Sequence, residues 1–381
     1  MLFRIFIHRQ FNNIKKYMAD SHLLINLSFL LAEPTGISTY AANVFPYLKK
    51  LDPTLLTAHH YPDFNCHSIP NNLTPAQGTK GHFNRLLWTQ FQLSKIYKQL
   101  KADLLFSPIP EAPLYQKTRN IIMVHDLIPL RFPRWNSALT QYFKWWFPEV
   151  LGQSEHIICN SQATADDLIK FFQVPSQKIT PILLAYNAQH FCRLENLSPL
   201  NPDSKPYFLY LGRHDPHKNL ARLLTAFSKL PNYENYELWL AGPTDKRYTP
   251  QLGLQAQELG IQNQVKFLDY VSYQQLPIIL NQAFALVFPS LWEGFGFPVI
   301  EAMACGTPVI TSNLSSLPEV AGDAAILVNP YEVWELTNAM QSLIQDQKLR
   351  SQLIDRSLQQ AKQFSWEKTG LETQAVLEQF L

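Results

Sequence analysis

The sequence predicts an α/β protein built from two doubly wound parallel sheets in series. Apolar strand-like runs alternate with helical stretches from about residue 22, a rhythm typical of βαβ units. The rhythm restarts once, after the polar, proline-bearing stretch "RLENLSPLNPDSKP". The chain has 381 residues, more than the about 250 to 300 at which a single hydrophobic core usually stops growing, so we expect two domains.

The restart places the domain boundary near residues 195–204. We expect an N-terminal extension, two Rossmann-like domains and a C-terminal helix, over residues 1–20, 21–198, 199–360 and 361–381 respectively. In such folds ligands bind outside the carboxyl ends of the strands. Site residues should therefore follow strands and face the cleft between the domains.

The individual elements follow from the apolar pattern. In the first half, the strands "HLLINLSFLL", "NIIMVHDL" and "HIICNS" precede the helix "TGISTYAANVFPYLKKL", a long aromatic segment and the helix "ATADDLIKFF". In the second half, the strands are "YFLYLG", "YELWLAG", "QVKFLDYV", "FALVFPS", "PVITSN" and "AAILVN", with helices at "NLARLLTAFSKL", "YQQLPIILNQ" and "PVIEAMAC". The last fifty residues are predicted to be helical, with a break at "FSWEKTG".

Composition narrows the class of protein. Hydrophobic residues make up 46% of the chain and charged residues 16%, which suits packed cores rather than disorder. The four cysteines form no close pair, so neither a disulfide framework nor a zinc knuckle is indicated, and a reducing cytoplasm fits best. No apolar run reaches the roughly 20 residues of a membrane-spanning helix, and the first 20 residues lack a signal-peptide cleavage site.

The charge is unevenly distributed. Residues 1–200 hold 19 Lys and Arg against 12 Asp and Glu, giving +7, and residues 201–381 hold 13 against 18, giving −5, which together make the net charge of +2. A basic half without a nucleic-acid motif indicates an anionic membrane surface or an anionic acceptor, or simply an unevenly solvated surface. Nucleic acid is not an expected partner.

A pair of cations follows the first strand of the second half, in "GRHDPHKNL". Arg213 lies on the connection and Lys218 is predicted in the first turn of the next helix. A cation there opposes the helix dipole unless an anion occupies the spot, and a helix N-terminus suits phosphate. The pair therefore predicts a diphosphate site, and two solvated loop cations are the alternative. We interpret His214 and His217 as loop residues, because no third metal ligand accompanies them.

Two glutamates flank a glycine-rich turn in "FPSLWEGFGFPVIEAMACGTPVI". Gly294 and Gly296 allow close approach of the backbone to a ligand, and Pro298 suits an early helix position. Glu301 is predicted in the first helical turn, where the dipole alone would favour an acid. Glu293 lies on the loop above and has no such explanation, so both carboxylates are expected to read the hydroxyls of a ligand.

Three residues of the first half follow strands. Gly36 opens a helix in "TGISTY", where backbone N–H groups could approach a phosphate or sugar. His125 and Asp126 end the strand "IIMV", at the place where polar side chains reach into a crevice. A site role for His125 is favoured over a structural one.

Taken together, "TGISTY", "VHDLIPLRFP", "LGRHDPHKNL" and "PSLWEGFGFPVIEAMACGTPVITSNLSSLPEVAGDAA" resemble glycosyltransferase family 4. The resemblance covers the chain from about residue 22 to the end, in the family's order and spacing. It implies the GT-B fold, two Rossmann-like domains that face each other across a cleft, and a C-terminal helix that packs back on the first domain. It also implies a retaining hexosyltransferase that uses a nucleotide-sugar donor.

The resemblance further implies roles for the residues that match. Arg213 and Lys218 correspond to the pair that neutralises the donor diphosphate, Glu293 to the reader of the donor sugar and Glu301 to the ribose-binding glutamate. The remaining residues of the implied site are Gly36 near the β-phosphate, His125 with Asp126 near the reacting face of the sugar, and Gly212 with the backbone of Gly294, Phe295, Gly296 and Phe297 around the donor. One departure is the single glycine of "AEPTGIS", where many members have two.

The chemistry is expected to need no metal ion and no cofactor. Metal-dependent transferases hold a divalent cation with an Asp-x-Asp triplet, which this sequence lacks, so side-chain cations must stabilise the leaving diphosphate. The retaining step is expected by resemblance to be front-face attack, with Asp126 the only local carboxylate for a double displacement. The competing classes are a nicotinamide-dependent oxidoreductase, disfavoured because the Gly-x-Gly-x-x-Gly fingerprint is absent, a sugar-nucleotide epimerase, and a catalytically silent binding protein.

The donor and the acceptor are less well marked. The segment "SSLPEVAGDAA" resembles that of mannosyl-transferring members, which favours GDP-mannose over UDP-glucose, and the acceptor is expected to be a glycan or a lipid-linked sugar. The aromatic segment "RFPRWNSALTQYFKWWFPEV" is interpreted as packing most of its rings against the sheet, and an interfacial face for lipid-linked acceptors is the alternative. A cytoplasmic protein, with peripheral contact to the inner face of the membrane as an option, is the expected location.

Overall fold

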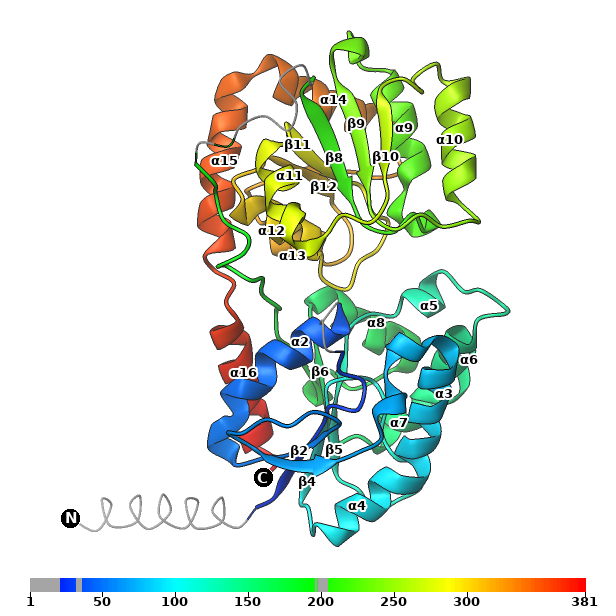
Figure 1. Ribbon diagram of the computed structural model, residues 1–381, viewed down its shortest axis with the longest axis vertical. Helices are drawn as coiled ribbons and strands as arrows, with labels where there is room; N and C mark the ends of the chain where they lie inside the picture. Colours follow the sequence, from blue (N-terminus) through cyan, green and yellow to red (C-terminus); the bar gives the residue numbers. More distant parts are fainter. Residues whose placement is uncertain (1–20, 32–35, 196, 198–204) are drawn as a thin grey trace, which may run out of the picture. The chain divides into compact units, whose positions relative to one another are not determined.

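The computed structural model describes residues 21–31, 36–195, 197 and 205–381 (Figure 1). The predicted N-terminal extension, the predicted boundary at residue 198 and residues 32–35 of the predicted phosphate loop lie outside this part of the chain. Two units form. One runs through Asn160 and adds Thr164–Ile182 and Trp366–Leu381, and the other comprises Ser161–Ala163 and Leu183–Ser365.

The first unit is built on a seven-stranded sheet in which every neighbouring pair is parallel. The strand order is β3-β2-β1-β4-β5-β6-β7. The central strands are buried on both faces, as continuous apolar runs require in a parallel sheet. The strands are β1 Leu23–Asn26, β2 Thr54–Thr57, β3 Asn65–Ser68, β4 Leu104–Ser107, β5 Asn120–Val124, β6 His156–Cys159 and β7 Ile179–Pro181.

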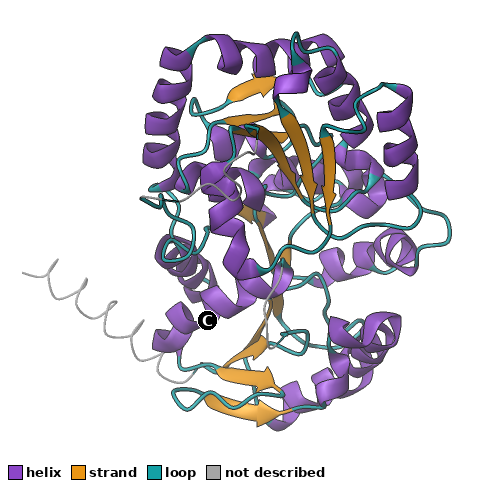
Figure 2. Ribbon diagram, turned by 45° about the horizontal axis from the view of Figure 1, so that its top comes forward, coloured by secondary structure: helices purple, strands orange, loops and turns teal. Residues whose placement is uncertain are grey.

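The second unit holds a six-stranded parallel sheet in the order β10-β9-β8-β11-β12-β13. Its strands are β8 Tyr207–Leu211, β9 Glu237–Ala241, β10 Val265–Leu268, β11 Ala285–Phe288, β12 Val309–Ser312 and β13 Ile326–Val328. All six were predicted from the sequence. Helices lie on both sides of these strands (Figure 2), so the predicted α/β class with two doubly wound sheets is confirmed.

Helices connect the strands within each unit. Those of the first unit are α2 Ile37–Val44, η1 Phe45–Leu51, η2 Asn71–Leu73, η3 Pro75–Gln77, α3 Gly78–Trp88, η4 Thr89–Leu93, α4 Ser94–Gln99, α5 Ile128–Arg131, α6 Ala138–Trp145, α7 Phe147–Gln153, α8 Gln162–Phe172, η5 Ser176–Lys178 and α16 Trp366–Glu378. Those of the second are η6 Pro216–Lys218, α9 Leu220–Ser228, η7 Tyr233–Asn235, α10 Thr249–Glu258, η8 Tyr273–Gln275, α11 Leu276–Gln282, α12 Phe297–Ala304, α13 Leu317–Ala321, α14 Val333–Gln345 and α15 Gln347–Ala361.

The last helix, α16, returns to the first unit. It follows the predicted break after α15 and packs against η1 and α2, close to the start of the chain's described part (Figure 1). Gly370 allows α16 to approach closely, because a Cβ atom there would lie 2.5 Å from Cβ of Tyr47. The hydroxyl of Ser21 also donates a hydrogen bond to the carbonyl of Leu381.

The predicted aromatic segment is divided between core and surface. Phe143 and Phe147 are buried in the cluster of apolar side chains beneath β5 and β6, as the packing interpretation requires. The three tryptophans of the segment, Trp135, Trp145 and Trp146, are instead exposed. The packing interpretation, which concerned most of the rings, therefore does not extend to the three tryptophans.

Each sheet has one point at which the winding direction reverses. In the second unit the chain moves from β8 outward to β9 and β10, then returns to β11 and moves outward in the opposite direction. Neighbouring strands at such a reversal send their following loops apart, which opens a crevice at their carboxyl ends. In the second unit this point lies between β8 and β11, and in the first unit it lies between β1 and β4.

Candidate active site

The reversal point of the second sheet carries two loops with the predicted donor residues. The β8 loop, Gly212 to Asn219, holds Arg213 and Lys218, and the β11 loop, Pro289 to Gly296, holds Glu293. The two loops contact each other, since the N–H of Leu291 donates to the carbonyl of His217 over 2.8 Å. Lys218 and Glu293, 75 positions apart in sequence, are thus brought to one place.

Lys218 and Glu293 form the closest contact of this site. Nζ of Lys218 donates to Oε1 of Glu293 over 2.6 Å, and their side chains are only 15% and 11% exposed. The ammonium group also lies 5.7 Å from the ring centre of Phe288. Removal of either partner from a pair this far from water would leave the other charge uncompensated, which is strongly destabilising.

Lys218 does not occupy the first turn of a helix, and that prediction is wrong. It ends the one-turn η6, and α9 begins only at Leu220. Asn219 intervenes in a left-handed conformation, with φ 66°, which breaks the helical pattern. Its side-chain amide donates to the carbonyls of Pro289 and Pro330, at 3.1 and 2.7 Å, and so fixes the turn that carries Lys218.

Arg213 is the exposed cation of the site. Its side chain is 64% exposed, and Nε donates to Oδ2 of Asp215 over 3.0 Å. The backbone at this position is fixed from below, because the hydroxyl of the buried Tyr210 donates to the carbonyl of Arg213 over 2.7 Å. Burial, with the nearby carboxylate of Glu293, holds the pKa of Tyr210 well above its ordinary value, so this hydroxyl remains a donor.

Gly212 is required by the turn that begins the β8 loop. Its φ of 147° is a conformation that side chains rarely adopt, and a Cβ atom would lie 2.9 Å from the hydroxyl of Tyr210. Gly242, at the end of the neighbouring strand β9, is closer still, since its Cβ would lie 2.1 Å from the carbonyl oxygen of Gly212. These two strand ends can therefore approach only as glycines.

The turn between β11 and α12 is held by two serines. The N–H of Glu293 donates to Oγ of Ser315 over 3.1 Å, and the hydroxyl of the buried Ser316 lies 2.7 Å from the carbonyl of Phe295 and 3.1 Å from that of Glu293. Gly296 begins α12 with φ 117°. The serines belong to the segment "SSLPEVAGDAA", whose structural role here is to fix the loop that carries Glu293.

The rest of the predicted backbone contact follows Glu293 directly. Gly294 lies in the loop, the ring of Phe295 is buried, and Phe297 starts α12 with Pro298 beside it. The rings of Phe295 and Phe297 meet edge to face at 5.4 Å. The early helix position predicted for Pro298 is confirmed.

Glu301 lies one turn further along α12 than predicted. The helix begins at Phe297 and has no acid in its first turn, so the first-turn prediction is wrong and the helix dipole does not account for this glutamate. Burial raises the pKa of Glu301 from 4.5 to about 8. Its carboxylate has no hydrogen-bond or ion-pair partner among the described residues. It acts on the pKa of Tyr273, whose ring stacks on His190 at 3.8 Å.

The first unit contributes the other predicted residues. Gly36 precedes α2 with φ 53°. His125 follows β5 and is buried, with Nε2 lying 3.0 Å from the carbonyl of Pro108, so this nitrogen donates and Nδ1 is the acceptor. Burial lowers the pKa of His125 to about 4, which keeps the ring neutral. Oδ1 of Asp126 accepts the N–H of Ile128 over 3.0 Å.

Sequence reasoning did not identify the residues that position the charged groups. Tyr210 is an ordinary aromatic strand residue in the sequence, and Ser315 and Ser316 follow a different strand. Asp215 and Asn219 could have been identified from the sequence, because both lie in the short polar stretch between Arg213 and the following helix. Their roles appear only when the two loops are placed side by side.

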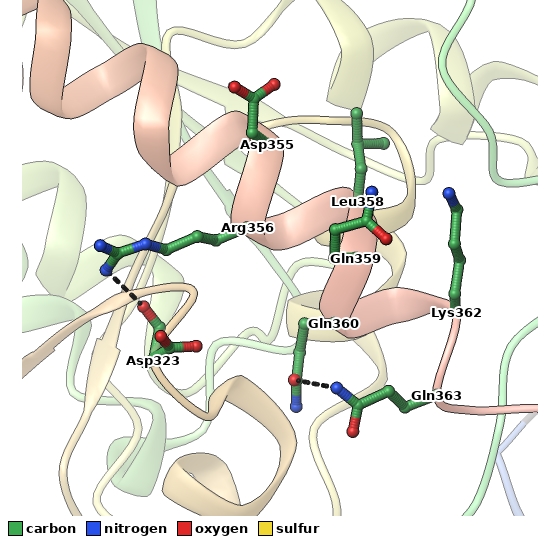
Figure 3. Close-up of a pocket in the computed structure, with 8 residues that line it drawn as sticks. All are labelled: Asp323, Asp355, Arg356, Leu358, Gln359, Gln360, Lys362 and Gln363. Carbon is green, nitrogen blue, oxygen red and sulfur yellow. Dashed lines mark hydrogen bonds between the residues drawn. The ribbon is translucent and has the colours of Figure 1, made fainter.

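A polar hollow lies elsewhere in the second unit. It is formed along α15 and at Asp323, and Figure 3 shows its lining side chains, Asp323, Asp355, Arg356, Leu358, Gln359, Gln360, Lys362 and Gln363. None of the predicted site residues lines it. Across the described ranges, no three His, Cys, Asp or Glu side chains gather closely enough to hold a metal ion. In the same ranges every helix is too short or too polar to cross a bilayer.

Comparison with known proteins identifies the family of this chain. Residues 34–188 match the model of "Glycosyltransferase Family 4" and residues 195–360 that of "Glycosyl transferases group 1". The O-antigen chain mannosyltransferase B of Escherichia coli is 32% identical over 264 residues, 67% of this chain and 69% of that protein. The O-antigen chain mannosyltransferase RfbU of Salmonella typhimurium is 28% identical over 337 residues, 85% and 91% of the two chains.

Solved structures show the same fold. Sucrose-phosphate synthase from Thermosynechococcus elongatus superimposes with a TM-score of 0.73 at 19% identity, over 94% of this chain and 98% of the other. HepE from Anabaena, in complex with UDP-glucose, superimposes with a TM-score of 0.70 at 17% identity, over 94% and 99%. Both halves of the sequence thus match one family and both sheets match one fold. The chain belongs to glycosyltransferase family 4 and is a hexosyltransferase of the GT-B fold.

Proposed function

We propose that this glycosyltransferase moves mannose from GDP-mannose to a glycan or lipid-linked acceptor, with retention of configuration and without a metal ion. The choice of mannose is supported by two relatives that are named O-antigen mannosyltransferases. Their alignments with this chain cover 69% and 91% of their own lengths. The site is supported above all by the arrangement of Arg213, Lys218 and Glu293 on two touching loops at the reversal point of the second sheet. UDP-glucose is the second candidate donor, since HepE binds it on the same fold.

The proposed chemistry follows from where negative charge develops. When the bond between sugar and nucleoside diphosphate breaks, charge builds on the leaving oxygen and must be stabilised. The ammonium of Lys218 is held in place by Glu293. The guanidinium of Arg213 is exposed and can contact the diphosphate of a donor that binds from solvent. Two fixed cations of this kind could perform the task that a divalent ion performs in metal-dependent transferases.

Glu293 has a second role in this proposal. Its Oε1 is bound by Lys218, which leaves Oε2 to accept hydrogen bonds from a hydroxyl of the donor sugar. Glu301, without a protein partner in the described part of the chain, is proposed to bind the ribose. His125 is neutral, so it is proposed to contact the sugar as a hydrogen-bonding group and not as a cation.

The acceptor hydroxyl is proposed to attack the same face that the diphosphate leaves, and the departing phosphate takes its proton. Asp126 is the candidate nucleophile of the alternative double displacement. Mass spectrometry of the enzyme with donor alone distinguishes the two, because a covalent glycosyl-enzyme adduct would contradict the front-face route. An epimerase on this fold would instead convert the donor without any acceptor, and a silent homologue would bind it and release no diphosphate.

Calorimetric titration with GDP and UDP, followed by turnover of the matching sugar nucleotides, tests the donor. We expect GDP to bind more tightly and GDP-mannose to be consumed when a lipid extract or glycan acceptor is present. Excess EDTA should leave the rate unchanged. Loss of transfer on chelation, restored by a divalent ion, would contradict the metal-free mechanism.

The proposed location is the cytoplasm, with peripheral contact to the inner face of the membrane. The first half of the chain carries an excess of seven positive charges by the count given above, and an anionic inner leaflet attracts such a surface. A lipid-linked acceptor would be presented at that surface. Fractionation of cells into soluble and salt-extractable membrane fractions tests this location.

A further inference from the structure

Three tryptophans of the first unit are left in water. Trp135 is 84% exposed, Trp145 63% and Trp146 52%. Tryptophan is usually well covered in a folded protein, because its large ring gains more from burial than most side chains. Such exposure within one short segment indicates a surface that is covered by something else.

Two of these rings form one cluster with a lysine. Nζ of Lys144 lies 5.8 Å from the ring centre of Trp135 and 4.9 Å from that of Trp145. Gln141 links the two residues, since its Oε1 accepts the indole N–H of Trp145 over 3.0 Å and its Nε2 donates to the backbone carbonyl of Trp135 over 3.1 Å. We call Trp135, Gln141, Lys144 and Trp145 the tryptophan–lysine cluster.

The cluster stands on the outer side of α6. Thr140 and Phe143 are the buried residues of this helix, and its N-terminus is fixed by Ser137, whose side chain accepts the N–H of Thr140. Phe143 packs into the core of the first unit. The inner side of α6 is therefore occupied, and the cluster belongs to a helix that is anchored in the fold.

The segment that carries the cluster has charges of one sign. Residues 127–148 contain no Asp or Glu, and three cations, Arg131, Arg134 and Lys144. Arg131 is neutralised by Asp167, whereas Lys144 has no ion-pair partner within the described residues. An ammonium that contacts exposed indole rings and forms no ion pair among the described residues suits an anionic surface.

We propose that the tryptophan–lysine cluster docks this enzyme on an anionic phospholipid bilayer. Indole rings favour the boundary between headgroups and acyl chains, where the ring is desolvated and the N–H still finds an acceptor. Lysine adds attraction to the phosphates of that layer. A neutral glycan, the other ligand that exposed tryptophans suit, is usually read by carboxylate and amide groups, and the cluster offers one amide and no carboxylate.

This proposal assigns the peripheral membrane contact of the proposed function to the tryptophan–lysine cluster. Vesicle binding can be disproved while the proposed glycosyl transfer still holds. Its test is sedimentation of the full chain, without donor or acceptor, with vesicles of phosphatidylcholine alone or of phosphatidylglycerol and phosphatidylcholine in equal parts. We expect binding to the anionic vesicles and a blue shift of tryptophan fluorescence. The double variant W135S/W145S should bind at least about tenfold more weakly, and K144E about fivefold more weakly at low salt.

Matched control variants lie in the second unit. Trp334 is 59% exposed on α14, and Lys348 is exposed on α15, so W334S and K348E should bind vesicles as the wild type does. Binding of GDP and the thermal unfolding transition, unchanged in every variant, show that a loss of vesicle binding is not a loss of folding.

Three results would overturn the proposal. The first is vesicle binding by W135S/W145S equal to that of the wild type. The second is a loss confined to F83S/F91S, which changes another exposed apolar stripe of the first unit, over α3 and η4. The third is unchanged vesicle binding by W135S/W145S together with lost binding of a mannan oligosaccharide, which would identify the cluster as a glycan surface.

Discussion

The ion pair between Lys218 and Glu293 gives the most direct test of the donor site. The variant Glu293→Gln keeps the shape of the side chain and removes its charge, which leaves the ammonium of Lys218 largely buried without a counter-charge. The two side chains are 15% and 11% exposed, so this is close to a fully buried pair. Breaking such a pair costs about 3 to 5 kcal/mol, and the residual exposure favours the lower end, about 3 kcal/mol.

The assay is urea unfolding followed by tryptophan fluorescence, with and without GDP. GDP lacks the sugar that Glu293 is proposed to hold, so a difference in GDP binding between wild type and variant reports on the ammonium of Lys218 and not on a lost sugar contact. In the wild type the diphosphate must compete with Glu293 for the ammonium, whereas in Glu293→Gln it faces no competition. The free energy of unfolding of the variant should therefore rise more on addition of GDP than that of the wild type, in the form expected for a ligand that binds only the folded state.

Two comparisons make this test decisive. The double variant K218M/E293Q should be less destabilised than the sum of its single variants, which measures the coupling of the pair. The exposed pair of Lys49 and Asp63, whose side chains are 59% and 79% exposed, is the control, and Asp63→Asn should change stability by less than about 1 kcal/mol. The reasoning is refuted if Glu293→Gln is as stable as this control, or if GDP stabilises it no more than the wild type.

Three further predictions concern single residues. Arg213→Ala should lower turnover at saturating donor by about a hundredfold with little loss of stability, because the side chain is mostly exposed; near-normal transfer would refute its role. Glu301→Gln should flatten the pH dependence of the free energy of unfolding. Burial raises the pKa of Glu301 from 4.5 to about 8, so the folded protein holds a proton that the unfolded chain releases, and the free energy of unfolding falls as pH rises through that range. An identical pH dependence of wild type and variant would contradict this. Since burial lowers the pKa of His125 to about 4, kcat/KM should show no histidine-dependent change near pH 6.5, and a change there that His125→Gln abolishes would show the ring to be charged.

The sequence predicted the sheet of the second unit fully and that of the first in part. Long apolar runs such as "YFLYL" and "NIIMV" mark buried strands, whereas β2, β4 and β7 were not identified from the sequence and β3, "NCHS", is a half-exposed edge strand. Polar edge strands such as β3 lack the apolar pattern that predicts a strand. Their places in the sheet are set by pairing with distant strands.

The candidate site was predictable in its location and not in its contacts. Residues that follow β8 and β11 had to meet, because the two strands are neighbours at the reversal point. The predicted helix positions of Lys218 and Glu301 were each wrong by a few residues. For Lys218 the reason is that "HKNLARLL" has the pattern of one helix, whereas Asn219 adopts a left-handed conformation that interrupts it. Hydrogen bonds such as that of Tyr210 depend on the exact direction of a buried side chain, and no spacing in the sequence encodes that direction.

The return of α16 to the first unit determines how the two units of this enzyme can be separated. The polypeptide passes from one unit to the other before residue 183 and back again after residue 365, so a single cut cannot yield two whole halves. A fragment that ends at Ile182 would lack α16, which packs on Tyr47. The apolar surface beneath that helix would then be exposed to solvent. Separate study of the two units therefore calls for a circular permutant, or for the missing helix supplied as a separate peptide.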